Sequence, residues 1–232
     1  MSGQRIDITW LGGPEIDALK INDQEILDSI EVSLKAQGEG RTAIEPRMHL
    51  QPSKAPTAPP VSGHFNVLRG YIEPLGVAGV KVVGDFHDNY TRGLRSEMGL
   101  LNLFDPITGT PLAVLDASDI TDMRTGAITA IGAKYLAKKD SKILGHIGAR
   151  GTAYWNVRLL DHLFDFDEIR VHSRRKESRE PFAERLRADL GKDVIVTEDW
   201  RSCLEGADIM IEASRLTEPA PMFKTDWIQP GA

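Results

Sequence analysis

The C-terminal half of the chain alternates short apolar runs with amphipathic stretches. The runs are "SKILGHIG" (141–148), "EIRVHS" (168–173), "DVIVTE" (193–198) and "DIMIEAS" (208–214), each of the length of a strand. Between them, helices are predicted from near Gly151, over 177–191 with Gly191 as C-cap, and over 200–207. Strict alternation of strand and helix predicts a parallel sheet with right-handed crossovers.

The N-terminal half follows a different pattern. A helix is predicted over 22–40, capped near Asn22 or Asp23, with Ile26, Ile30 and Leu34 on one face. Strand-like runs follow at 44–50, 63–72, 78–86, 100–104 and 111–116, and the last two flank a hairpin turn that contains Pro106 and Gly109. Closely spaced strands predict an antiparallel or mixed sheet. The Pro-rich segment 51–60 is interpreted as a loop or arm.

A long helix is predicted over 118–137, with Ser118 as N-cap, and the domain boundary is expected within or just after it. The expected fold class is therefore α/β. Residues 1–130 would form an α+β domain that binds substrate and dimerises, and residues 131–232 a Rossmann-type domain. That domain shows four strands where a complete dinucleotide fold has about six, so it is expected to be C-terminally truncated.

Composition narrows the class of protein. A net charge of −6 and a pI of about 5.6 argue against nucleic-acid binding. No window approaches the roughly 20 apolar residues of a membrane span, and the N-terminus has no apolar segment typical of a secretory signal. The single cysteine, Cys203, cannot form an internal disulfide. A reduced, cytoplasmic setting and an enzymatic role are expected.

The glycine-containing turn "GHIGARGTA" (145–153) follows the first strand of the C-terminal half. In a dinucleotide turn, one glycine permits the tight turn, a second allows the backbone to approach the pyrophosphate, and a third residue packs helix on strand. The register Gly148, Arg150, Ala153 fits the first and third roles but has arginine in the second. The register Gly145, Gly148, Gly151 is an alternative, and a purely structural turn remains a second one.

The end of the second strand bears on the choice of cofactor. NAD-binding proteins place an acidic residue there to bind the adenosine ribose, whereas this chain has Ser173, Arg174 and Arg175. A hydroxyl and two guanidinium groups would bind a 2′-phosphate through charge-assisted hydrogen bonds. The sequence thus favours NADP(H), with NAD(H) also compatible. The alternative is a solvated basic start of the following helix.

Residues 94–137 carry a family resemblance. Within them, "GLLNLFDPITGTPLA" and "DMRTGA" are the most specific pieces, and the chain from about residue 20 onward resembles the ornithine cyclodeaminase/mu-crystallin family. The resemblance implies a homodimer of two-domain subunits that binds NAD(H) or NADP(H). It implies hydride removal from the α-carbon of ornithine, ring closure on the imine with loss of ammonia, and hydride return to give proline. Relatives include alanine dehydrogenases, cyclic ketimine reductases and non-catalytic crystallin-type NADP-binding proteins, which remain alternatives.

Three basic residues match substrate positions of that family. Arg124 would bind the α-carboxylate bidentately, Arg47 would be a second carboxylate contact, and Lys81 would be the catalytic residue. Burial between apolar neighbours would lower the pKa of Lys81 and suit it to proton transfer. The alternatives are a surface helix arginine, a charge at the sheet edge and a lysine whose amine reaches solvent. The expected cofactor-binding residues are Arg124, Thr125, Gly148, Ala149, Arg150, Gly151, Thr152, Ser173, Arg174, Arg175, Ala213 and Ser214, with Thr121 close by.

Two further expectations concern metal and length. Asp85, His87 and Asp88 in "GDFHDNY" could be mistaken for metal ligands, but no second cluster with ligand spacing accompanies them, and no metal is expected. In the resembling family, the catalytic aspartate lies just beyond the turn that corresponds to "WIQPGA" (227–232). A protein of this length is therefore expected to be poorly stable and catalytically impaired.

Overall fold

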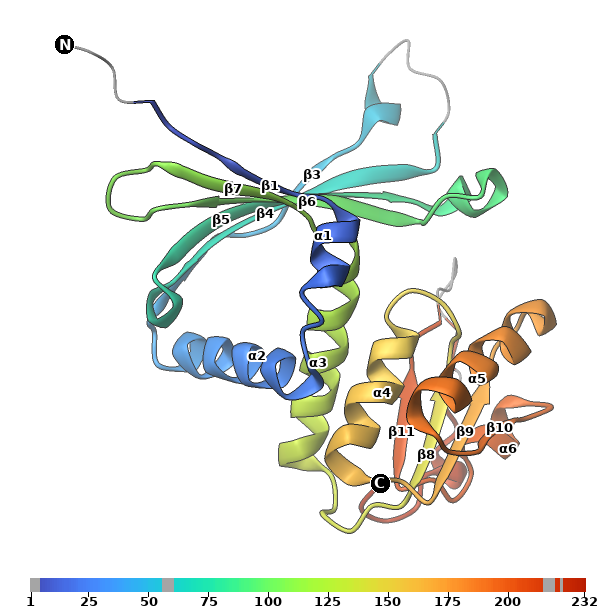
Figure 1. The fold of residues 1–232 in the computed structure, drawn as a ribbon. Coiled ribbons are helices and arrows are strands. Elements are labelled where there is room, and N and C mark those ends of the chain that lie inside the picture. The colour runs from blue at the N-terminus through green and yellow to red at the C-terminus, as the bar shows by residue number, and fades with distance from the viewer. Residues whose placement is uncertain (1–4, 56–60, 215–219, 222) are drawn as a thin grey trace. The chain divides into compact units, whose positions relative to one another are not determined.

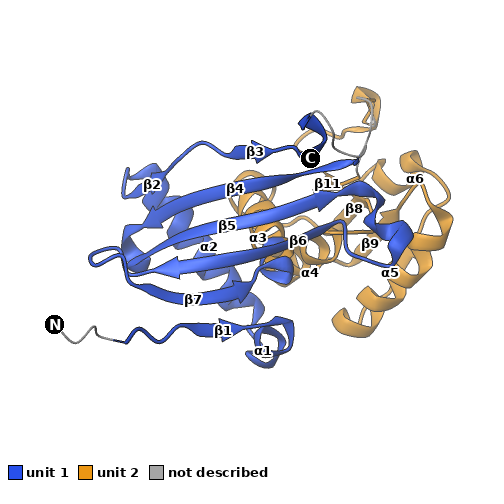
Figure 2. Cartoon of the chain, turned by 90° about the horizontal axis from the view of Figure 1, so that it is seen from above, with its two compact units in different colours: residues 1–121 blue, residues 122–232 orange. Residues whose placement is uncertain are grey.

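The computed structural model describes residues 5–55, 61–214, 220–221 and 223–232. Residues 56–60 of the predicted arm lie outside this part of the chain. The chain divides into two compact units, residues 1–121 and 122–232 (Figure 2). The division falls inside the long helix that was predicted over 118–137, nearer to its start than the expected boundary after residue 130.

Unit 1 is built on a mixed sheet (Figure 1). Its strands in the described residues are β1 (Thr9–Leu11), β2 (Thr42–Ile44), β3 (Met48–Leu50), β4 (Gly63–Ile72), β5 (Val77–Phe86), β6 (Glu97–Phe104) and β7 (Pro111–Asp116). Their order is β1-β7-β6-β5-β4-β2, with β3 also paired to β4. Only β1 with β7 is parallel among these pairs, which confirms the predicted antiparallel or mixed sheet.

Two details of the sheet differ from the prediction. The run 44–50 is not one strand, because β2 ends at Ile44 and β3 begins at Met48. Pro46 lies in the gap, where it has no N–H to donate to the ladder. Arg47 therefore precedes a strand rather than lying within one. The parallel edge strand β1 was not predicted at all.

Three helices belong to unit 1 in whole or in part: α1 (Gly13–Ala18), α2 (Asp23–Gly38) and α3 (Ser118–Leu136). The Asn22 side chain caps α2 by accepting from the Glu25 N–H at 2.9 Å, as predicted. The predicted apolar stripe was partly wrong, because Leu34 is exposed while Leu27 is buried. The long helix starts at Ser118 instead of being capped by it. The Asp116 carboxylate accepts from the Ser118 N–H at 2.8 Å.

Unit 2 contains a parallel sheet covered by helices. Its elements are β8 (Ile143–Ile147), α4 (Ala153–Phe164), β9 (Glu168–His172), α5 (Lys176–Leu190), β10 (Val194–Val196), α6 (Trp200–Leu204) and β11 (Ile209–Glu212). The order β10-β9-β8-β11 is all parallel. In chain order this is 3-2-1-4, the arrangement of the first strands of a Rossmann sheet. The predicted parallel sheet is confirmed, and Gly191 closes α5 in the left-handed conformation.

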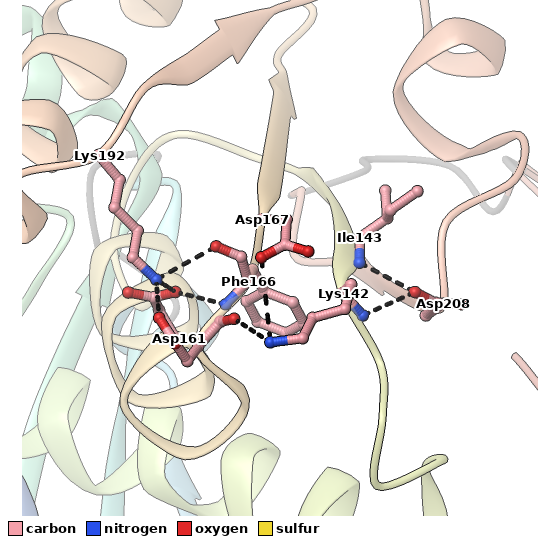
Figure 3. A network of polar contacts seen from close by, with 8 residues as sticks. Lys142, Ile143, Asp161, Phe166, Asp167, Lys192 and Asp208 are labelled. Atoms are coloured by element: carbon pink, nitrogen blue, oxygen red, sulfur yellow. Dashed lines mark hydrogen bonds and ion pairs between the residues drawn. The ribbon is translucent and has the colours of Figure 1, made fainter.

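The amino ends of these strands are held together by an ionic network around Lys192 (Figure 3). Its ammonium donates to the Asp161 carboxylate at 2.9 Å and to the Phe166 carbonyl at 3.1 Å, and it also pairs with Asp165. These contacts join the end of α4, the loop before β9 and the end of α5. The network thus fixes the edge of the sheet opposite to the one where parallel α/β folds bind ligands.

Short 3₁₀ turns complete the described residues at Pro52–Lys54, Glu73–Leu75, His87–Arg92 and Thr225–Trp227. Across the described ranges, none of the helices combines the length and the apolar character needed to span a membrane.

Candidate functional site

The turn after β8 has a geometry that only glycine can adopt. Gly148 has φ 113°, and a Cβ on it would lie 2.6 Å from the Ala213 carbonyl oxygen. Its N–H donates to the His172 carbonyl at 2.8 Å, and the Ala213 N–H donates to the Ile147 carbonyl at 2.8 Å. The ends of β8, β9 and β11 therefore meet at this turn. Strand order reverses between β8 and β11, which is where such sheets bind ligands.

The residues after Gly148 lead into the positive end of α4. Gly151 has φ 57° and open space where a Cβ would be, and Arg150 is exposed. Thr152 is the N-cap residue but makes no side-chain capping bond. The N–H groups of the first turn of α4 are thus not capped by a side chain, an arrangement suited to phosphate oxygens. Ala149, which precedes Arg150, is half-buried.

The two proposed glycine registers differ in what their residues contact. Ala153 is fully buried at the start of α4, which suits the helix–strand packing role. A Cβ on Gly145 would instead lie 2.3 Å from the Cys203 carbonyl oxygen. Gly145 therefore permits the close approach of α6 to the sheet, away from the turn. This geometry supports the register Gly148, Arg150, Ala153.

A fully buried histidine, His146, contacts the backbone of this turn, and it was not identified from the sequence. The Nδ1 of His146 lies 3.2 Å from the Gly148 carbonyl, so this nitrogen must carry the proton. Its Nε2 then accepts from the Asn156 amide at 3.3 Å. Burial lowers the pKa of His146 to about 4, so the ring is neutral at physiological pH. The sequence did offer one indication of its importance, since His146 is the single polar residue in the apolar run "ILGHIG".

The three residues expected at the ribose end lie between β9 and α5. Ser173 and Arg175 are half-buried and Arg174 is exposed. A further arginine, Arg179, donates to the Ser173 carbonyl and to His172 Nε2, the latter at 3.2 Å. Because burial lowers the pKa of His172, that ring is neutral and accepts from the guanidinium. Arg179 was missed because it lies one helical turn beyond the motif.

The remaining cofactor candidates lie on α3 and after β11. Arg124 and Thr125 are half-buried and precede Gly126, where a Cβ would lie 2.6 Å from Trp155. The helix α3 thus approaches the first turn of α4 closely at this point. Ser214 donates from its N–H and its hydroxyl to the Glu212 carboxylate, while Ala213 faces Gly148.

In unit 1, Lys81 lies on β5 and its amine donates to the Thr121 hydroxyl of α3 at 3.1 Å. Arg47 is exposed and precedes β3. The next residue, Met48, pairs with Val67 of β4, whereas Lys81 of β5 pairs with Leu68 of β4. Lys81 therefore neighbours Leu68, and its amine is directed towards the start of α3.

Within "GDFHDNY", His87 Nδ1 lies 3.5 Å from the Asp85 carboxylate. In the part of the chain that the structure describes, no three His, Cys, Asp or Glu side chains are grouped so that they could hold a metal ion.

Comparison with known proteins places this architecture in a family. The sequence pattern of the ornithine cyclodeaminase/mu-crystallin family matches residues 14–232. Alanine dehydrogenase of Archaeoglobus fulgidus is 28% identical over 218 residues, which cover 94% of this chain and 62% of that protein. Ketimine reductase mu-crystallin of Rattus norvegicus is 31% identical over 76% of this chain and 55% of its own length.

A solved structure agrees with these relatives. Thermococcus litoralis Δ1-pyrroline-2-carboxylate reductase, in complex with NADH and L-proline, superposes with a TM-score of 0.88 and 30% identity, covering 97% of this chain and 67% of its own. The chain therefore spans between about half and two thirds of the length of these relatives. The match over residues 14–232 shows that this chain belongs to the ornithine cyclodeaminase/mu-crystallin family.

Proposed function

We propose that the protein transfers hydride between a nicotinamide dinucleotide and the carbon–nitrogen centre of a small amino acid or its imine. The observation that carries this proposal is the Gly148 turn, where a side chain would collide with the Ala213 carbonyl and where an uncapped helix start follows. The relatives whose names describe a dehydrogenase or a reductase of such substrates support the same class of reaction.

The residues present fit a dinucleotide. Gly148, Ala149, Arg150, Gly151 and Thr152 would hold the pyrophosphate against the positive end of α4. Ala213 and Ser214 would line the neighbouring strand end, and Arg124 and Thr125 would contribute from α3. When bound, the nicotinamide would exchange a hydride with the substrate.

NADP(H) is proposed as the preferred form. Ser173, Arg174 and Arg175 carry hydroxyl and guanidinium donors where an NAD-binding protein has a carboxylate. Arg179 adds a third positive charge to the same loop. A 2′-phosphate would be bound by charge-assisted hydrogen bonds there. NAD(H), which the Thermococcus litoralis enzyme binds in its reduced form, remains the alternative.

The proposed substrate-binding residues have separate tasks. Arg47, which precedes β3, and Lys81 on β5 would bind the α-carboxylate. The Lys81 amine, held by Thr121, is also placed to exchange a proton with the substrate nitrogen. Arg124 would provide a planar, bidentate carboxylate contact.

Two kinds of reaction fit this class, and they differ in whether the cofactor is changed at the end. Conversion of ornithine to proline and ammonia returns the hydride to the product, whereas ketimine reduction or alanine dehydrogenation changes the redox state of the cofactor. The arginines after β9 and the names of the relatives favour the second.

The test is an incubation of the purified protein with ornithine, alanine or a cyclic ketimine, each with NAD(H) or NADP(H). Proline and ammonia without net cofactor turnover would establish cyclodeamination. Net oxidation of NADPH by the ketimine would establish the reductase. Absence of dinucleotide binding at micromolar protein and millimolar cofactor would contradict the proposal.

We also propose that the protein is a homodimer through the face of the unit 1 sheet opposite to Lys81. The strand registers place Val67, Val82, Leu100 and Phe104 on this face, together with Trp10. Trp10 is 64% exposed and Leu100 is 43% exposed. Helix α2 of unit 1 lies behind the sheet in Figure 2, so it does not cover this face.

The same face has a hollow of about 390 Å³ lined by Arg69, Glu45 and Tyr71 among others. The Nη1 of Arg69 is buried there without a hydrogen-bond partner. An apolar face containing an unsatisfied donor is incomplete as a solvent-facing surface. A second copy related by a twofold axis would bury it on both subunits.

A further inference from the structure

A buried imidazole lies next to the turn after β8 and takes no part in the chemistry proposed above. His146 of β8 has no exposed surface. Its ring contacts Asn156 of α4 and lies 6.2 Å from the ring of Phe182 of α5, so it points to the side of the sheet that these two helices cover. A polar ring is costly to place there unless its nitrogens are hydrogen-bonded. What His146 contributes therefore depends on what those nitrogens contact.

The two ring nitrogens have partners of opposite kind. Nδ1 lies 3.2 Å from the Gly148 carbonyl oxygen, which can only accept a hydrogen bond. Nε2 lies 3.3 Å from the Asn156 amide nitrogen, which can only donate one. A neutral imidazole carries one proton on its nitrogens, so these contacts place it on Nδ1. The Asn156 amide thus selects the tautomer that donates to Gly148.

Rotation of the Asn156 amide by half a turn would not improve this arrangement. Its Oδ1 is buried and has no donor among the described residues, and rotation would let Oδ1 accept from a protonated Nε2. The proton would then be absent from Nδ1, whose lone pair would face the Gly148 carbonyl oxygen. Two acceptors at hydrogen-bond distance repel each other, and a buried carbonyl would lose its donor. One unsatisfied amide oxygen is the smaller cost.

The bond to His146 sets the orientation of the peptide between Gly148 and Ala149. This peptide is trans, and in a planar trans peptide the carbonyl and the following N–H point in opposite directions. Because the Gly148 carbonyl points to the buried ring, the Ala149 N–H points away from it and out of the core. Among the described residues, no backbone carbonyl accepts from this N–H, and Ala149 is half-buried. An outward N–H beside the uncapped start of α4 is suited to a phosphate oxygen.

A glycine at position 148 needs such support from another residue. Its φ of 113° favours a residue without a Cβ, but glycine also rotates more freely than any other residue, so it does not fix the plane of the next peptide by itself. The Gly148 N–H donates to the His172 carbonyl at 2.8 Å, and its carbonyl accepts from His146. Both polar groups of the glycine are therefore held before a ligand binds, and less conformational freedom is lost on binding.

We propose that His146 is a positioning residue for the pyrophosphate of the dinucleotide: its Nδ1–H holds the Gly148 carbonyl so that the Ala149 N–H is directed at a phosphate oxygen. This inference rests on the proposed dinucleotide site and adds to it a residue that does not touch the ligand. Asn156 acts one step further away, because it keeps the proton on Nδ1.

The test uses substitutions that keep one nitrogen position of the ring at a time. An asparagine side chain places its amide nitrogen where Nδ1 lies, and a glutamine side chain reaches the position of Nε2. His146→Asn should therefore keep the bond to Gly148 and bind dinucleotide within about threefold of the wild type. His146→Gln and His146→Leu should bind it at least about tenfold more weakly, because the turn is no longer held. Calorimetric titration at neutral pH, with NADPH and with NADH, measures all four proteins.

Two further measurements separate positioning from stability. Leu186→Ala truncates a fully buried side chain in the second half of α5 and is the matched control. It should lower the melting temperature as much as the His146 substitutions do and leave the affinity unchanged. In proton–nitrogen correlation spectra, the Ala149 amide proton should move downfield when dinucleotide binds to the wild type or to His146→Asn. It should not do so in His146→Gln.

The outcomes distinguish this inference from the proposed function. If His146→Asn loses as much affinity as His146→Gln, or if neither loses any, the Nδ1–H does not position the turn, although the dinucleotide site stands. If affinity follows melting temperature across all variants, Leu186→Ala included, the ring is only structural and the inference fails. If the wild type binds neither NADPH nor NADH, the proposed function fails, and this inference fails with it.

Discussion

Gly148 combines two separate requirements for a residue without a side chain. Its φ of 113° is strained for any L-residue, and a Cβ would overlap the Ala213 backbone, which cannot move without shifting β11. Gly151 has only the first requirement, because nothing lies within 4 Å of where its Cβ would be. A substitution at Gly151 therefore measures the cost of backbone strain alone, whereas a substitution at Gly148 adds the cost of a collision with the Ala213 backbone.

We expect Gly148→Ala to lower the free energy of unfolding by roughly 3 kcal/mol and to abolish dinucleotide binding. Gly151→Ala should cost only about 1 kcal/mol. Urea unfolding and titration of the protein with NADPH measure the two effects. If both variants lost the same free energy of unfolding, the close approach of Ala213 to Gly148 would not contribute to the effect of the substitution.

His146 makes the stability of unit 2 depend on pH. The pKa of its buried ring is about 4, below the unfolded value of about 6.5, so the unfolded chain binds a proton more readily. Stability from this group is complete above pH 6.5 and is lost as the pH falls towards 4, by up to roughly 3 kcal/mol.

His146→Gln should therefore flatten the dependence of unfolding free energy on pH between 6.5 and 4, measured by denaturant titration at several pH values. His162→Gln changes a histidine on the exposed side of α4 and serves as the control. It should leave the slope unchanged. A wild-type profile that is flat across this range would contradict the assignment of a neutral, buried His146.

At the scale of elements, Lys192 joins three segments that are distant in sequence. Asp161 is nearly buried and accepts both from Lys192 and from the Phe166 N–H at 3.0 Å. Hydrogen bonding to Lys192 lowers the pKa of Asp165. Asp165 therefore adds stability above its unfolded pKa, and this contribution is lost as the pH falls through the lower, folded value.

Lys192→Met should destabilise the protein by about 2 kcal/mol, because Asp161 would remain buried with its main partner removed. Lys142→Met is the control. Its ammonium donates to the Asp165 carbonyl at 2.9 Å and pairs with an exposed Asp167, and such surface contacts contribute about 0–1 kcal/mol. Thermal unfolding of both variants at pH 7 compares them. A smaller loss in Lys192→Met than in Lys142→Met would contradict the role given to the network.

Sequence periodicity predicted most of these elements, and its failures have identifiable causes. The four parallel strands and α2 with its Asn22 cap follow from local patterns and were predicted. The break at Pro46 was missed because the apolar alternation of 44–50 continues through it. The edge strand β1 pairs with β7, about a hundred residues away, and no local signal reveals such a contact.

The candidate site shows the same limit. Gly148 and Lys81 belong to recognisable motifs, whereas the importance of His146 and Arg179 comes from side-chain contacts that form only in the folded chain. The His146 ring bonds to the Gly148 carbonyl, and Arg179 donates to the Ser173 carbonyl. Their residue types are unremarkable in isolation.

At the scale of the whole molecule, the unit 1 sheet exposes apolar side chains on the face opposite to Lys81, here called the open face. No element of unit 1 among the described residues is known to bury them. One face of the unit 1 sheet packs against α2, and its other face carries Trp10, Met48, Leu50 and Leu100, each at least 40% exposed. Stable dimer interfaces bury about 800 Å² on each partner, and exposed apolar side chains on a sheet face are typical of them.

Leu100→Glu should therefore shift the protein towards monomer, with dissociation at least about tenfold easier, because a twofold interface would contain the new carboxylate on both subunits. Ile107→Glu is the matched control. Ile107 is 91% exposed in the turn between β6 and β7, outside the open face, and the variant should keep the oligomeric state. Sedimentation equilibrium at several concentrations measures both. A wild-type protein that remains monomeric at high micromolar concentration would refute the proposed dimer while leaving the cofactor site untouched, since Gly148 and its neighbours belong to unit 2.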